Sequence, residues 1–126
     1  MRTLLLGPAL GCGLYALVAR RPPAPRPPRR EDGGLVATVL VSAVVEELLW
    51  RGVVLRTLAR HGRRRALAVT TGAFAAAHLP HASGRDLVVH AGVGGVLGLT
   101  TLRGHLATAA IAHGAYNALA LLEEPP

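Results

Sequence analysis

The sequence predicts an all-α fold, an integral membrane bundle of about five helices built on a four-helix core. Of the 126 residues, 51% are hydrophobic, and the mean hydropathy is positive at +0.38. This composition leaves too little polar surface for a soluble domain of this size. The apolar residues fall into five stretches, which arginine, glycine and proline separate. The length suggests a single domain.

The charge balance narrows the choice of partners. The net charge is +7, and all 14 basic residues are arginines. We exclude nucleic acid as a partner, because the arginines lie between apolar stretches and only 3% of the residues are aromatic. Contact with anionic lipid headgroups fits this pattern better. The single cysteine, Cys12, rules out an internal disulfide and a cysteine-rich metal site.

The first two segments lie outside the predicted core. Residues 1–20 are apolar and are predicted to form an N-terminal transmembrane helix, in which glycine and proline are tolerated. Residues 21–34 are rich in proline and arginine, so we expect an extended linker. Residues 35–122 then hold the four remaining apolar stretches.

The stretch Leu35–Leu58 is predicted to be a helix long enough to span a membrane. Polar residues recur at every fourth position on one face of it: Thr38, Ser42 and Glu46. Glu47 and Arg51 are also four apart, about 100° round the helix, so they are expected to form an ion pair along it. We expect the two stripes together to form a polar sector that faces the interior of the bundle.

Three more helices are predicted after it: Ala66–Leu79, Leu87–Leu102 and Leu106–Leu122. Pro80 stops the first of them. The second contains Gly94-x-x-x-Gly98, a spacing of small residues that lets membrane helices approach closely.

Glu46, His78 and His113 come from three of these helices, and each is polar in apolar surroundings. Such groups tend to face the interior of a bundle and to meet there. Two hydrolytic chemistries are open. The three side chains hold a metal ion that activates water, or Glu46 acts as general base on a water that His78 also holds. In the second case, His113 and Asn117 donate to an oxyanion.

The motif order resembles that of the CAAX-protease and bacteriocin-processing family, also called the Abi or type II CAAX prenyl endopeptidase family. The residues that carry the resemblance are Glu46-Glu47-x-x-x-Arg51, Phe74-x-x-x-His78 and His113-x-x-x-Asn117. The stretch from Gly94 to Leu106 is also similar, although His105 stands where the family usually has serine. The resemblance covers the four-helix core, and the chain is short for the family, whose members usually have more helices.

The resemblance implies an intramembrane endopeptidase, in a multi-pass protein of a bacterial cell membrane. It implies that Glu46 activates water, that His78 shares this water or a metal, and that His113 and Asn117 stabilise the oxyanion or complete the metal shell. Glu47 and Arg51 are expected to support the site. The family has been described both as metalloproteases and as glutamate proteases. We expect no cofactor, or Zn²⁺ on Glu46, His78 and His113; the lack of a His-Glu-x-x-His motif favours the glutamate mechanism.

The expected partners are membrane lipids and a peptide or protein substrate within the membrane. A second hypothesis is a non-catalytic membrane immunity or interaction protein that retains the protease core. A third, a transporter fragment with Glu46 as a proton relay, leaves the last motif unexplained. We expect ordinary packing for Phe74 and Trp50, and no role in the site for the other histidines: His61, His81, His90 and His105.

Overall fold

The computed structural model of the chain describes residues 2–81 and 83–123, and the regular structure in this part is helical throughout. The elements are α1 (Arg2–Ala19), α2 (Asp32–Glu47), the π-helix η1 (Leu48–Leu55), α3 (Arg56–Ala59), α4 (Arg63–Ala77), the 3-10 turn η2 (Leu79–His81), α5 (Gly84–Leu102) and α6 (Leu106–Leu122). Residue 1 of the predicted first helix and the side chain of His81 lie outside the described part. The all-α prediction is confirmed.

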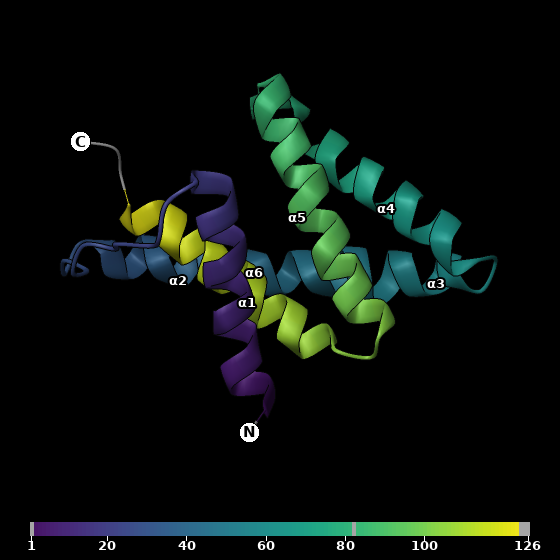
Figure 1. Cartoon of the computed structure of the whole chain (residues 1–126), viewed down its shortest axis with the longest axis horizontal. Helices are drawn as coiled ribbons and strands as arrows, with labels where there is room; N and C mark the ends of the chain where they lie inside the picture. The colour runs from purple at the N-terminus through teal and green to yellow at the C-terminus, as the bar shows by residue number, and fades with distance from the viewer. Residues whose placement is uncertain (1, 82, 124–126) are drawn as a thin grey trace.

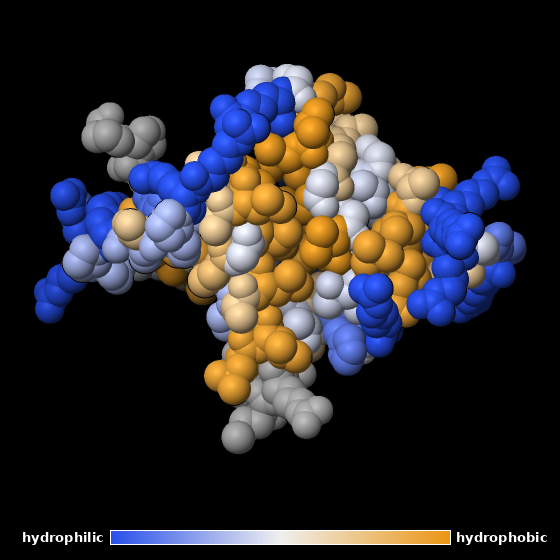
Figure 2. Space-filling model, viewed as in Figure 1, coloured by the Kyte–Doolittle hydropathy of each residue, from blue (hydrophilic) through white to orange (hydrophobic). Residues whose placement is uncertain are grey.

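α2, η1 and α3 run without a break from Asp32 to Ala59 and form one helix of 28 residues, which we call the long helix. It extends along the molecule, and α1, α5 and α6 cross it in the view of Figure 1, while α4 leads away from its α3 end. By length and composition it is able to cross a membrane, and only 11% of its most apolar window is buried. Figure 2 shows broad hydrophobic surface over the middle of the molecule and hydrophilic surface at its extremities. This distribution suits an apolar surrounding.

The long helix turns a different face inward from the one that we expected. Ala43, Glu47, Arg51 and Leu55, at every fourth position, are at most 1% exposed. Thr38 and Ser42 are exposed, so the expectation that they face the interior was wrong. The Thr38 hydroxyl donates to the carbonyl of Gly34 one turn earlier, 2.9 Å away, which satisfies it within its own helix.

α5 begins three residues before the predicted start because its first turn is capped. The Ser83 hydroxyl accepts from the backbone N–H of Asp86, and the Asp86 carboxylate accepts from the N–H of Ser83 at 2.9 Å. This reciprocal capping box satisfies two N–H groups that a helix terminus otherwise leaves without partners. α5 thus includes residues 84–86, which precede the predicted helix.

α1 packs along α6 and closes one side of the core. A Cβ added to Gly11 would lie 2.5 Å from the carbonyl oxygen of Ala112, so only glycine permits this approach. Leu14 joins the core cluster formed by α5 and α6. The Tyr15 hydroxyl donates to the Glu123 carboxylate at 2.7 Å, which ties the end of α1 to the end of α6. These contacts hold α6, and the residues that it presents, in place.

Candidate functional site

One pocket, of about 220 Å³, is lined by residues of all four core helices and contains the four residues predicted to be catalytic. Its lining is Glu46, Phe74, His78, Val89, His90, Val93, His113, Tyr116 and Asn117. One cavity is therefore shared by Glu46, His78, His113 and Asn117. Its volume is large enough for several water molecules, each of which occupies about 30 Å³. Glu47 and Arg51 do not line it.

Glu46 is the acidic side chain of this pocket. It is half-buried, and among residues 2–81 and 83–123 its carboxylate forms no hydrogen bond and no ion pair. Because neither oxygen is committed to a protein donor, the carboxylate is free to accept a proton from a molecule in the pocket.

Glu47 is fully buried and holds a histidine and an arginine together. Its Oε1 atom lies 2.9 Å from His113 Nδ1 and 2.9 Å from Arg51 Nη1. The expected pairing of Glu47 with Arg51 is thus present in the structure. The Arg51 contact is ionic rather than a directed hydrogen bond, since Nη1 has no acceptor in line with its N–H. The Glu47–Arg51 pair cancels its own charge in the interior, as a buried pair must.

Arg51 is positioned from three directions. Its Nη2 donates to the carbonyl of Gly94 on α5 at 3.2 Å. Its guanidinium carbon lies 4.2 Å from the centre of the Phe74 ring, a cation–π contact. A Cβ on Gly94 would lie 3.0 Å from Arg51 Nη2, so the small-residue spacing of α5 makes room for this side chain. Phe74 therefore packs, as expected, and also covers the buried charge.

The histidines of the pocket share one hydrogen-bonding pattern. His78 Nδ1 lies 2.8 Å from the carbonyl oxygen of Phe74. Since carbonyl and ionised carboxylate oxygens only accept, the Nδ1 atoms of His78 and His113 both carry the proton. Each ring is thus held in one tautomer, and the Nε2 atom is the one left for chemistry in the pocket.

His90, for which we expected no role, lines the same pocket. Its ring stacks on that of His78, with centroids 4.1 Å apart and an interplanar angle of 27°. Its Nδ1 donates to the carbonyl of Asp86 at 2.6 Å, the same bond that His78 makes to Phe74. In the sequence, the available signal was a lone histidine within an apolar helix.

The donor set does not form a metal site in this arrangement. Within the described ranges 2–81 and 83–123, no three histidine, cysteine, aspartate or glutamate side chains are placed to hold one ion. Glu46, His78 and His113, which we considered as zinc ligands, line the same pocket without converging on one point.

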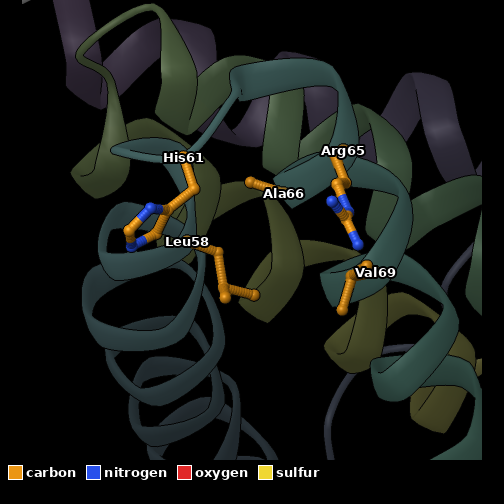
Figure 3. A pocket seen from close by; sticks show the side chains of 5 residues that line it. All are labelled: Leu58, His61, Arg65, Ala66 and Val69. Atoms are coloured by element: carbon orange, nitrogen blue, oxygen red, sulfur yellow. The ribbon is translucent and has the colours of Figure 1, made fainter.

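A second hollow, of about 240 Å³, lies where α3 meets α4 and is lined by Leu58, His61, Arg65, Ala66 and Val69 (Figure 3). None of the predicted site residues lines it, and it has no acidic side chain. It therefore lacks a carboxylate like that of Glu46 in the first pocket.

Residues 33–119, more than half of the chain, match the family model described as type II CAAX prenyl endopeptidase Rce1-like. The matched range contains every residue of the pocket. No curated protein and no solved structure matches the chain.

Proposed function

We propose a function on the premise that the chain belongs to the Rce1-like family of type II CAAX prenyl endopeptidases. Members of this family are embedded in membranes, and membership indicates that the chain is a peptidase. Beyond this, we propose that the chain is a multi-pass intramembrane endopeptidase of a bacterial membrane that hydrolyses its substrate with water activated by Glu46. The observation that carries this proposal is the half-buried Glu46 carboxylate, without a hydrogen-bond or ion-pair partner in the described part of the chain, in one pocket with His78, His113 and Asn117.

In the proposed first step, a water molecule lies between Glu46 and His78. Its two O–H groups donate to the Glu46 carboxylate and to His78 Nε2, which accepts because the ring carries its proton on Nδ1. Glu46 takes one proton as the water oxygen forms a bond to the carbonyl carbon of the scissile peptide. The carbonyl oxygen becomes an oxyanion in the same step.

We propose that His113 and Asn117 stabilise this oxyanion. They are four residues apart on α6 and so lie on one face of that helix. The Asn117 amide donates directly, and His113 donates through Nε2 when its ring is protonated. Glu47, bonded to Nδ1 of the same ring, fixes the orientation of the ring. The proton on Glu46 then passes to the leaving nitrogen as the C–N bond breaks.

His90 is, in this proposal, a positioning residue for His78. The stacked ring limits how His78 can turn, and the two Nδ1–carbonyl bonds set both rings in register. A stacked aromatic pair contributes about 0.5–1.5 kcal/mol. If this energy orients His78 toward the water, His90 contributes up to about a tenfold factor in rate.

The test is cleavage by the purified full-length chain in detergent, with a prenylated CAAX-type reporter and a library of fluorogenic membrane peptides as substrates. Glu46→Gln should lower kcat/KM by at least about a thousandfold, the combined scale of general-base catalysis and water positioning. Glu31→Gln is the matched control, since this carboxylate is 76% exposed in the linker. Activity that survives in Glu46→Gln would refute the mechanism.

A chelator arm separates the two chemistries that the family suggests. Activity that is retained with chelator supports the metal-independent scheme, and activity lost with chelator and restored by Zn²⁺ contradicts it. A chain that binds a membrane partner equally well as wild type and as Glu46→Gln, and cleaves no substrate, would instead support the non-catalytic immunity or interaction protein.

A further inference from the structure

Exposed arginines gather where the long helix turns into α4 and where α5 turns into α6. We call this surface the basic end; it consists of Arg56, Arg60, Arg63, Arg64, Arg65 and Arg103. Figure 2 shows the hydrophilic surface over these two turns, next to hydrophobic surface of the helices behind them. The basic end is therefore charged at its tip and apolar directly beneath.

No carboxylate balances this charge. The sequence has no aspartate or glutamate between Glu47 and Asp86. Elsewhere in the described chain, acidic residues pair with arginines: Arg21 with Glu123 at 2.9 Å, and Arg26 with Asp32 at 2.6 Å. Within the described ranges, no arginine of the basic end has such a partner. The linker side of the molecule therefore has carboxylates paired with some of its arginines, and the basic end has none.

A hollow of about 310 Å³ lies within the basic end, between α4 and α5. Its lining has two halves: three arginines, Arg63, Arg64 and Arg103, and three leucines, Leu67, Leu99 and Leu102. Arg63 donates to the carbonyl of Leu102, so α4 and α5 are joined at this point and the arginines are brought together across two helices. Leu99 is 42% exposed and continues the apolar wall outward.

We propose that this hollow binds the headgroup of an anionic glycerophospholipid. A guanidinium group donates two parallel hydrogen bonds to a pair of phosphate oxygens. The three arginines together carry more positive charge than is needed to balance the single negative charge of a phosphodiester. The leucines suit the first methylenes of the acyl chains, which a free phosphate ion does not have. Basic pockets between membrane helices at the headgroup level have this character. The hollow shares no residue with the pocket of Glu46, and lipid binding there does not depend on peptidase activity.

The experiment measures retention of palmitoyl-oleoyl phosphatidylglycerol by the full-length chain in detergent, by titration and native mass spectrometry. Each arginine near an anionic surface contributes about a fivefold factor. Arg63→Gln/Arg64→Gln/Arg103→Gln should therefore weaken binding by about 100-fold. The matched control removes three exposed arginines elsewhere: Arg20→Gln/Arg30→Gln/Arg85→Gln, with Arg85 at the opposite end of α5 from Arg103. This control should lose less than about threefold.

Arg63 also joins the two helices, so a second variant leaves it in place. Arg64→Gln/Arg103→Gln should weaken binding by about 25-fold with an unchanged unfolding midpoint. Equal loss in the site and control triples would overturn the proposal in favour of net charge alone. Equal retention of phosphatidylcholine would also overturn it. Competition by inorganic phosphate at concentrations near those of the lipid would show a free-anion site in its place.

Discussion

Glu47→Gln removes one negative charge from the interior and leaves the shape of the side chain unchanged. The wild-type carboxylate lies 2.9 Å from both Arg51 Nη1 and His113 Nδ1, and the Glu47 and Arg51 side chains are at most 1% exposed. The glutamine oxygen is still able to accept from His113. The Arg51 guanidinium, however, loses its counter-charge in a place that water does not reach, with one hydrogen bond to Gly94 left.

The expected loss in the free energy of unfolding is about 3–5 kcal/mol, the cost of leaving one partner of a buried pair uncompensated. The direct attraction agrees in scale, since two unit charges about 4 Å apart contribute about 4 kcal/mol at an effective dielectric constant of about 20. Glu46→Gln, next to it in the chain, should cost less than about 1 kcal/mol, because that carboxylate is half-buried and has no ion pair in the described part of the chain.

The assay is unfolding by SDS titration in mixed micelles, followed through the fluorescence of Trp50. This is the sole tryptophan in the sequence, and it lies 6.1 Å from the Phe74 ring that covers Arg51. The double variant Glu47→Gln/Arg51→Met should recover about 2 kcal/mol relative to the single one, because it removes both charges. Equal shifts for the two glutamate variants, or strictly additive effects in the double variant, would refute the reasoning.

Three further outcomes are expected. His90→Ala should lower kcat by about 3- to 10-fold with little change in KM, and His90→Phe should restore most of it by keeping a stacked ring; a rise in KM alone would contradict a positioning role. Gly94→Val should destabilise the fold by about 1–3 kcal/mol more than Gly92→Val, since a Cβ at Gly94 meets Arg51 and Phe74 at 3.0 Å and one at Gly92 meets nothing within 4 Å. The hydroxyl of Tyr15, with the N–H of Ala24 and the charge of Arg21, lowers the pKa of Glu123 below its ordinary value of 4.5. The stability that these contacts contribute should be full above that pH and should be lost as the pH falls below it. The difference in unfolding midpoint between wild type and Glu123→Gln should therefore shrink between about pH 7 and about pH 3.

The sequence was sufficient for those features that depend on spacing within one helix. The Glu47–Arg51 pair and the shared face of His113 and Asn117 follow from a separation of four residues, which any α-helix brings to one side. The number of helices follows from the alternation of apolar stretches with arginine-rich turns. These predictions needed no knowledge of how one helix lies against another.

The features that the sequence could not supply depend on contacts between helices. A helical wheel gives the angle between Thr38 and Glu47, but not which of the two faces a neighbour; packing against α6 and α5 selects the face of Glu47. The residue four positions before His90 is Asp86, and His90 bonds to its backbone carbonyl rather than to its side chain. The stacking partner of His90, His78, comes from another part of the chain, at the end of α4. Only the approach of α4 to α5 makes this histidine part of the site.

The adjacency of the two glutamates has a physical consequence for the proposed chemistry. Successive residues of a helix point about 100° apart and differ little in height along the helix axis. Glu46 and Glu47 therefore lie at nearly the same level and face different surroundings. Glu47 is paired with Arg51, whereas Glu46 lines the pocket and forms no hydrogen bond or ion pair with the described residues. A charge at membrane depth is costly unless a wet cavity or a partner receives it. We therefore expect the pocket to hold water next to Glu46, and this water would be the reactant of the proposed hydrolysis.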